Sequence, residues 1–238
     1  MKPIYRRVLL KLSGEALAQG AEGKSIYNFD LVRVICEKIR DLVGMGVQLA
    51  VVVGAGNIWR GKQGTDLDRV RADHMGMLAT AVNALCLQDT LEHLGVKAHT
   101  MTAISVTPFA EPFERVKAIA ALEKGEVVVF GCGLGSPYFS TDTASVLRAK
   151  EIEADVVLLA KNIDAVYTAD PRKDPNAKRL SSITYPEVLA QKLAVMDLTA
   201  TAFAMDNRLP ALVFGLNDPQ NIIRAVTGEA IGTVVTND

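Results

Sequence analysis

The chain has 238 residues, 49% of them hydrophobic and 22% charged, and this length and composition are typical of a globular α/β protein with a full core. Its formal net charge of -1 excludes the overall positive field on which proteins that bind DNA or acidic membranes depend. We therefore expect one domain over residues 1–238, with neither nucleic acid nor a membrane as its partner.

The cysteines and the apolar runs indicate where the protein works. Cys36, Cys86 and Cys132 lie far apart and form no CxxC pair, so they indicate neither a disulfide framework nor a zinc site. The basic start "MKPIYRR" is followed by the short run "VLL", too short for a signal-peptide core, and no apolar stretch approaches the ~20 residues that span a bilayer. We expect a cytoplasmic protein.

Short runs rich in β-branched residues alternate with segments of helical periodicity. The first run, residues 6–12, precedes a segment in which Ile35 and Ile39 recur at helical intervals after a capping residue, Asn28 or Asp30. In chain order the sequence then predicts a strand at 47–53, a helix at 74–95, a strand at 96–102, a helix at 112–125, strands at 126–131 and 155–161, a polar loop at 168–179 and a strand at 210–216. This alternation predicts a mostly parallel sheet with helices on both faces.

Three of the predicted strands run into turns rich in glycine or polar residues: "KLSGE", "VVVGAGN" and "FGCGLGSP". In open parallel sheets, ligands bind beyond the carboxyl ends of the strands, so these turns are expected to open onto one crevice. Glycine lets backbone N–H groups approach an anion closely, and phosphate is their natural ligand. Lys11 would meet anionic oxygens there, and a carboxylate such as Asp142 would pair with it in the empty protein. The alternative is a lysine that snorkels from a strand end into solvent.

Neither common nucleotide-binding fingerprint is present. No G-x-x-x-x-G-K-[ST] sequence occurs, which excludes a P-loop, and "GAGNIW" lacks the third glycine of the dinucleotide motif. Residues 131–135, "GCGLG", have alternating glycines but no suitably placed acidic residue at the end of a second strand, so they indicate a dinucleotide site only poorly.

Six motifs in collinear order resemble the bacterial UMP kinases, a branch of the amino-acid-kinase family. They are "KLSGEAL", "GxGNxxRG" at 54–61, "DHMGMLAT" at 73–80, "PxFxTDTA" at 137–144, "EIEADVVL" at 151–158 and "DAVYTADPRKDP" at 164–175. The resemblance implies a three-layer α/β/α fold and the ATP- and Mg²⁺-dependent phosphorylation of UMP to UDP. It also implies a homohexamer, with no metal held by the protein's residues alone.

The resemblance also implies roles for individual residues. Lys11, Asp142 and Lys161 would be catalytic, with Asp142 organising the lysines. Some relatives have a lysine at the position of Leu159, and Lys161 would replace it because residues two apart on a strand share a face. The expected ATP-binding residues are Lys11, Leu12, Ser13, Gly14, Gly56, Arg60, Lys161, Asn162, Tyr167 and Asp170. The expected UMP-binding residues are Ala55, Asp73, Leu134, Gly135, Ser136, Pro137, Tyr138, Phe139, Ser140 and Thr141.

The chain departs from the family pattern in both loops. Ala55 stands where relatives have the middle of three glycines; if that position needs φ > 0, alanine costs roughly 1–2 kcal/mol. Leu134 and Ser136 replace the threonine and asparagine of G-T-G-N-P, so we expect changes in affinity and selectivity before a loss of the reaction. Gln88 and Glu126 occupy the places of arginines that some relatives use for GTP, which leaves activation by GTP and inhibition by UTP open.

Some of these residues could have simpler structural roles, and the whole chain could have another function. Asp73 could cap the helix that follows it, and Tyr167 could be a half-buried loop anchor. A related enzyme would phosphorylate a carboxylate or a carbamate instead of UMP, and one branch of the fold stores oxyanions without catalysis. Asp73 and the "PYFSTD" loop favour a nucleotide, and the presence of Lys11, Asp142 and Asp170 favours catalysis.

Overall fold

The structure is a computed structural model that describes residues 2–23, 25–59, 66–171 and 173–238. Within these residues the main sheet has nine strands in the order β4-β3-β5-β2-β1-β6-β10-β11-β9, and every neighbouring pair is parallel except β10 and β11. The strands are β1 (Arg7–Leu12), β2 (Gln48–Val53), β3 (Ala98–Thr102), β4 (Glu111–Pro112), β5 (Val127–Gly131), β6 (Val156–Lys161), β9 (Ser182–Thr184), β10 (Ala211–Gly215) and β11 (Thr233–Thr236). A separate two-stranded ribbon joins β7 (Val166–Tyr167) and β8 (Arg179–Leu180).

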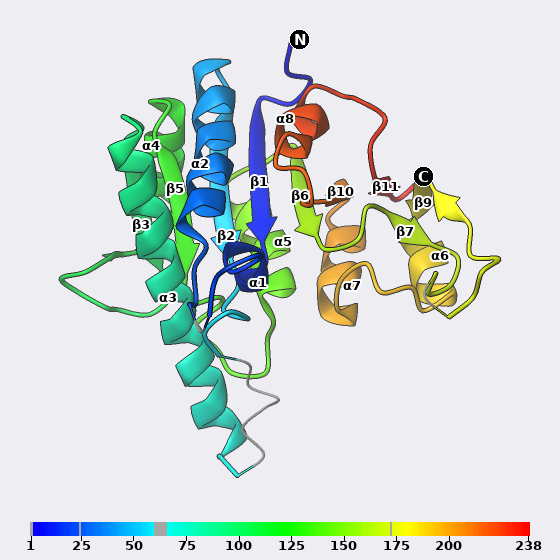
Figure 1. The fold of residues 1–238 in the computed structure, drawn as a ribbon, viewed down its shortest axis with the longest axis horizontal. Helices are drawn as coiled ribbons and strands as arrows, with labels where there is room; N and C mark the ends of the chain where they lie inside the picture. The colour runs from blue at the N-terminus through cyan, green and yellow to red at the C-terminus, as the bar shows by residue number, and fades with distance from the viewer. Residues whose placement is uncertain (1, 24, 60–65, 172) are drawn as a thin grey trace.

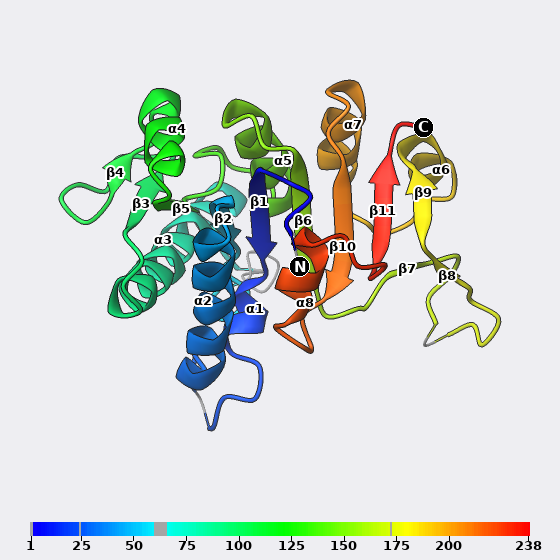
Figure 2. The same cartoon turned by 90° about the horizontal axis from the view of Figure 1, so that it is seen from above.

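Helices cover both faces of the sheet, as Figure 2 shows along its edge. One face carries α1 (Gly14–Leu17), α2 (Phe29–Gly44), α3 (Arg69–His93) and α8 (Asn221–Val226), and the other carries α4 (Arg115–Glu123), α5 (Thr141–Glu151), α6 (Tyr185–Ala190) and α7 (Leu198–Asp206). Side chains of β1 alternate between two apolar cores: Leu10 packs in the core under α2, and Leu9 in the core under α5. The predicted three-layer α/β/α fold with a mostly parallel sheet is confirmed.

The predicted strands all form, and the helix boundaries differ in detail. Asn28, not Asp30, caps α2, because its side chain accepts a hydrogen bond from the backbone N–H of Leu31. The helix predicted from residue 74 begins five residues earlier, at Arg69, and Asp68 caps it by accepting from the N–H of Arg71. The described helices include none with the length and apolar character needed to cross a bilayer.

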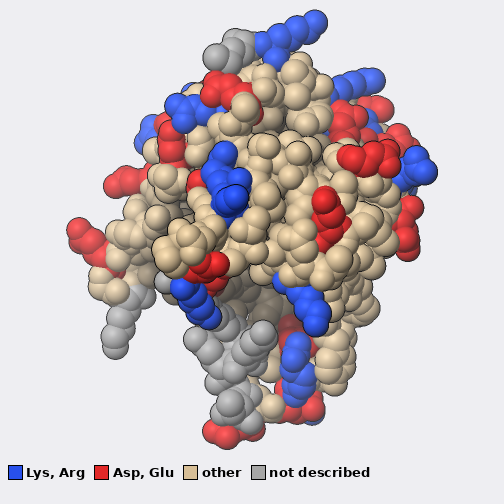
Figure 3. All heavy atoms as spheres, turned by 90° about the vertical axis from the view of Figure 1, so that its right-hand side faces the viewer, with Lys and Arg blue, Asp and Glu red and all other residues tan. Residues whose placement is uncertain are grey.

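The strand order changes direction at β1 and β6, so the crevice expected in parallel α/β proteins lies at the carboxyl ends of these two strands. β2, the next strand in the chain, pairs with one edge of β1, and β6 pairs with the other edge. The connections that leave the carboxyl ends of β1 and β6 therefore run to opposite sides of the sheet. Such a switch in strand order opens the space in which α/β proteins bind ligands. On the face of the molecule drawn in Figure 3, basic and acidic side chains are interspersed, in keeping with the small net charge.

Candidate active site

Lys11 and Asp142 form a buried ion pair at this crevice. Lys11 is the fifth residue of β1 and is 9% exposed, and Asp142 lies in the first turn of α5. The Lys11 Nζ atom lies 2.9 Å from Asp142 Oδ1. The predicted pairing is confirmed. A lysine held this way is available to an anionic ligand that offers a better partner.

Lys161 reaches the same site from the neighbouring strand. Lys11 pairs in register with Leu159 of β6, so Lys161, two residues on, lies on the same face of the sheet as Leu159. The Lys161 ammonium donates to the backbone carbonyl of Val195, in the segment before α7. Burial lowers the pKa of Lys161 and the positive charge of Lys11 adds to this effect, while Asp142 opposes it.

Asp142 stays ionised between these two lysines. Burial acts to raise its pKa, but the charges of Lys11 and Lys161 outweigh burial. Hydrogen bonds from Lys11 and from the backbone of Asp197 act in the same direction, so the pKa of Asp142 lies below its ordinary value. The site therefore holds two cations around one carboxylate, an arrangement suited to a ligand with several negative oxygens.

The first two glycine-rich turns interlock beside Lys11. A Cβ atom at Gly14 would lie 2.6 Å from the backbone nitrogen of Gly56 and 2.7 Å from the carbonyl oxygen of Gly54, and it would also collide with Asn57. Gly14 therefore has to be glycine because of close approach, not because of its backbone angles. Ser13 caps the short helix α1 by accepting from the N–H of Ala16, and the side chain of Leu12 is buried in the core.

The backbone of Ala55 does not have the positive φ that would strain an alanine. The described non-glycine residues with positive φ are Cys132, Tyr138, Glu153, Lys192 and Arg208, and Ala55 is not one of them. Alanine at this position therefore does not carry the free-energy cost of a positive φ. Arg60, the basic residue predicted to follow in the same loop, lies outside the described residues.

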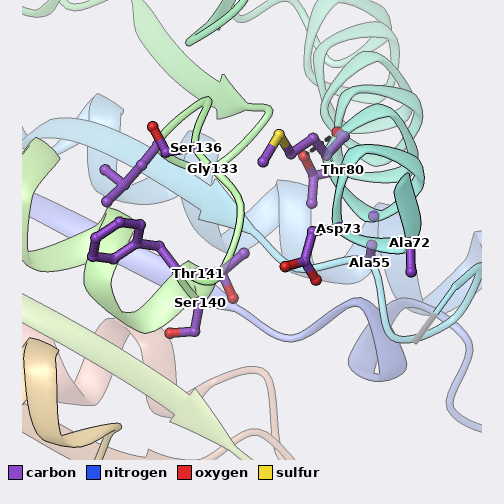
Figure 4. A pocket seen from close by; sticks show the side chains of 12 residues that line it. Ala55, Ala72, Asp73, Thr80, Gly133, Ser136, Ser140 and Thr141 are labelled. Carbon is purple, nitrogen blue, oxygen red and sulfur yellow. Dashed lines mark hydrogen bonds between the residues drawn. The ribbon is translucent and has the colours of Figure 1, made fainter. Parts of the chain in front are cut away.

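A pocket opens between α3 and the loop that follows β5 (Figure 4). Of the residues predicted to bind UMP, seven line it: Ala55, Asp73, Leu134, Ser136, Phe139, Ser140 and Thr141. Its other walls, which the sequence did not reveal, are Ala72, Gly76, Met77, Thr80 and Gly133. Thr141 directly precedes Asp142, so the pocket adjoins the site of the two lysines.

Asp73 lies inside α3 and points into this pocket (Figure 4). Its carboxylate accepts a hydrogen bond of 2.8 Å from the backbone N–H of Tyr138 and pairs with Arg69 one turn earlier, at 2.9 Å. The alternative of Asp73 as a helix cap is wrong, because Asp68 caps the helix. Asp73 therefore ties the helix to the loop and presents an acceptor to the pocket.

The loop after β5 has an unusual backbone. Cys132, Gly133, Gly135 and Tyr138 all have positive φ, which turns the loop back over α3. Gly135 packs against the backbone of Ala103 and does not line the pocket, and neither do Pro137 or Tyr138. The Tyr138 ring is 68% exposed and lies 5.4 Å from the guanidinium carbon of Arg69. These three residues shape the loop in this structure instead of lining the pocket.

The residues predicted for the adenosine side lie beyond Lys161. Asn162 is exposed directly after β6, and Tyr167 is half-buried on the ribbon, with its hydroxyl donating to Asp164 at 3.0 Å. Asp170 is exposed, and its carbonyl accepts from the N–H groups of Lys173 and Asp174. None of the three lines the pocket of Figure 4, so the structure separates them from the residues predicted for UMP.

Asp197 is a residue of the site that the sequence reasoning missed. Its carboxylate caps α7 by accepting from the N–H of Ala200, and it also accepts from the hydroxyls of Ser140 and Thr143 at the start of α5. It therefore joins the N-termini of two helices next to Asp142. The signal in the sequence is an aspartate before the apolar segment "LTATAFAM", a typical helix start.

Comparison with known proteins places this geometry in a family. The model of the amino acid kinase family matches residues 6–215. The crystal structure of UMP kinase from Bacillus anthracis is 39% identical in sequence, with a TM-score of 0.94 over 98% of this chain and 97% of that one. UMP kinase from Ureaplasma parvum is 35% identical with a TM-score of 0.92, and each chain is covered completely. Uridylate kinase from Archaeoglobus fulgidus is 28% identical with a TM-score of 0.75, over 96% of this chain and 99% of that one.

Proposed function

The chain belongs to the amino acid kinase family, and from this premise we propose that it is a UMP kinase that transfers the γ-phosphoryl group of ATP to UMP, giving UDP and ADP. The observation that carries the proposal is the buried Lys11–Asp142 pair beside two interlocked glycine turns. The full-length likeness to two UMP kinases supports UMP as the acceptor.

Phosphoryl transfer depends mainly on alignment and on charge stabilisation. In the proposed mechanism Lys11 and Lys161 leave their present partners and neutralise the oxygens of the moving group. Before the substrates bind, Asp142 pairs with Lys11 and its charge attracts Lys161, so it holds both ammonium groups at the site. The N–H groups of the interlocked turns at Gly14 and Gly56 provide dipoles for the same oxygens.

No general base is needed for the proposed reaction. The acceptor is itself a phosphate, and its second pKa of about 6 leaves it mostly dianionic at neutral pH. The chain has only three histidines, and none of them lines the pocket. Attack by the acceptor oxygen and release of ADP therefore require positioning by the residues of the crevice, not proton removal.

We assign the acceptor to the pocket of Figure 4. The Asp73 carboxylate would accept from the hydroxyls of the ribose, and Thr141 and Ser136 would contact the base or the phosphate through their hydroxyl groups. Leu134 lines the same pocket and offers only apolar contact. The adenosine would lie on the opposite side of Lys161, near Asn162, Tyr167 and Asp170.

The site also fits Mg²⁺ that arrives with ATP. The described residues contain no cluster of three or more histidine, cysteine, aspartate or glutamate side chains suited to a metal ion, whereas Mg²⁺ in kinases is commonly held by nucleotide phosphates with one or two carboxylates. Asp142, whose carboxylate lies at the site beside Lys11, is the carboxylate that would take part. When bound, the ion would supply further neutralisation of the phosphate charge.

The remaining features are proposals from the family resemblance. We propose a cytoplasmic enzyme of pyrimidine nucleotide synthesis that works as a homohexamer. Regulation by GTP or UTP is part of this proposal. The residues that would bind ATP and UMP keep the assignments given above, with Arg60 outside the described part of the chain.

A coupled kinase assay tests the proposal. ADP formation is measured with ATP, Mg²⁺ and each of UMP, CMP, AMP and GMP, with and without GTP. We expect turnover with UMP at a kcat/KM well above that of the other three acceptors. Phosphorylation of a carboxylate or carbamate acceptor without phosphorylation of UMP would overturn the proposal, and so would binding of nucleotides without any turnover.

A further inference from the structure

Asn83 is a fully buried amide whose hydrogen-bonding groups all have partners. It lies in the middle of α3 with 0% exposure. Its Nδ2 group donates to the carbonyl oxygen of Gly54 at 2.7 Å and to Asn57 Oδ1 at 2.8 Å. Its Oδ1 atom accepts from the hydroxyl of Tyr27 at 2.8 Å and from Asn57 Nδ2 at 3.1 Å. An asparagine with two donors and one acceptor oxygen is saturated by this set.

Two of the three partners of Asn83, Gly54 and Asn57, belong to the second glycine-rich turn. Gly54 directly follows β2 and is the first residue of the turn. Its N–H donates to the carbonyl of Leu12 at the end of β1. Asn57, in the same turn, lies against Gly14 of the first turn, closely enough that a Cβ atom there would collide with its side chain. A single side chain of α3 therefore fixes the turn that touches both Gly14 and the end of β1.

The same helix holds the third turn by a second buried hydrogen bond. Thr80, one turn before Asn83, accepts at 2.7 Å from the N–H of Cys132, at the start of the loop over the pocket. Residues three apart lie on the same face of a helix. Thr80 and Asn83 are therefore neighbours on α3, and each is hydrogen-bonded to a different loop, Thr80 to the loop after β5 and Asn83 to the turn after β2. Asp73 joins the same loop further up the helix.

We propose that Asn83 is a positioning residue for phosphoryl transfer, which holds the second glycine-rich turn in register with Gly14. The inference rests on the proposed function. Asn83 is fully buried beneath the turn, so it acts through Gly54 and Asn57. If its amide is lost, the carbonyl of Gly54 and the side chain of Asn57 lose their partners, and the turn shifts.

The size of the expected effect follows from the geometry of transfer. A displacement of about 1 Å at reacting groups lowers the rate about 100-fold. In the proposed mechanism the N–H groups of the turn act chiefly on the transition state, so displacement of the turn lowers kcat more than it changes the KM values for UMP and ATP. A purely structural role would lower the melting temperature but leave the kcat of the folded enzyme intact.

The test compares Asn83→Leu with a matched variant elsewhere on the same framework. Gln48, at the opposite end of β2, is also a buried amide and accepts from Arg7 Nε at 2.7 Å, so Gln48→Met removes a buried side-chain hydrogen bond far from the turns. Tyr27→Phe removes one hydrogen bond to Asn83 and leaves its bonds to Gly54 and Asn57 in place. Steady-state kinetics and thermal unfolding are measured for all four proteins, wild type included.

We expect Asn83→Leu to lower kcat by about 10- to 100-fold with small changes in KM. Gln48→Met should lower the melting temperature with kcat intact, and Tyr27→Phe should lower kcat less than Asn83→Leu does. Asn83→Leu with wild-type kcat, whatever its melting temperature, would overturn the inference. If Asn83→Leu does not fold, Asn83→Asp, which keeps the shape and the acceptor but not the donor to Gly54, gives the same comparison. A wild type inactive with UMP would instead refute the proposed function.

Discussion

The Lys11 ammonium lies 2.9 Å from the Asp142 carboxylate, and both side chains are less than one-fifth exposed. The pair joins the end of a central strand to the start of a helix on one face of the sheet. Removing one partner of such a buried pair costs about 3–5 kcal/mol because the other charge is left without compensation. Phosphate oxygens can take the place of Asp142 as partners of Lys11, so the same pair that stabilises the empty site prepares it for its ligand.

Asp142→Asn should change the response of stability to acid. The pKa of Asp142 is lowered from 3.8 in the folded protein, so its carboxylate contributes stability that is present above pH 3.8 and is lost as the pH falls through the lower, folded pKa. Urea unfolding from neutral pH to below 3.8 should show a shallower loss of unfolding free energy in the variant than in the wild type. Identical slopes in the two proteins would contradict the lowered pKa.

The pKa of Lys161 predicts an alkaline limit to activity. Burial lowers this pKa from 10.5, and only the protonated lysine can neutralise phosphate charge. We expect kcat to fall with an apparent pKa below 10.5. The guanidinium of Lys161→Arg stays charged throughout this range, so any activity it retains should persist to higher pH. An alkaline limb that is unchanged in Lys161→Arg would show that another group titrates.

Asp73→Asn should weaken binding of UMP and spare ATP. A hydrogen bond to a charged group contributes about 1.5–3 kcal/mol, which corresponds to an increase of about 10- to 140-fold in the KM for UMP. The KM for ATP should stay within about 2-fold of the wild-type value, because a pocket contact for one substrate acts on that substrate alone. Equal increases for both substrates would show that Asp73 acts through the fold of the loop at Tyr138.

Gly14→Ala should abolish activity, and Gly44→Ala should not. A methyl group at Gly14 meets the backbone of Gly54 and Gly56 within 2.7 Å, so the two turns have to separate. At Gly44, the last residue of α2, a methyl group meets nothing within 4 Å, and alanine is favoured over glycine in helices by about 0.5–1 kcal/mol. We expect at least ~100-fold loss of kcat/KM in the first variant, since misplacement by about 1 Å has this effect. Thermal melting of both variants separates misplacement of the turns from unfolding.

Much of the sheet could be predicted from the sequence because its longer strands are short apolar runs rich in β-branched residues, and three of them, β2, β5 and β10, end in glycine or are followed by it. The alternation along β1 and β6 even placed Lys161 on the face of Leu159, as the register shows. The start of α3 was missed because its first turn, before Asp73, is rich in charged residues and has little apolar periodicity. These elements could be predicted where the local sequence has a clear apolar pattern, and they were missed where it has none.

The anchors of the site could not be predicted because they depend on contacts between distant residues. Asn83 lies 29 residues from Gly54 along the chain, and Asp197 lies 57 residues from Ser140. Neither spacing leaves a periodic signal. The φ angle of Ala55 could not be predicted either. The glycines on either side of it suggested a positive φ, which Ala55 does not have in the structure.

The most direct test of the whole account is the rate of UDP formation by Lys11→Met, measured under saturating Mg·ATP and UMP beside the wild type. Methionine keeps the length of the side chain and removes its charge. We predict a loss of kcat of at least ~100-fold, the size typical when a group that stabilises transition-state charge is removed, with circular dichroism unchanged. A folded Lys11→Met protein that forms UDP at the wild-type rate would contradict the central role of the Lys11–Asp142 pair.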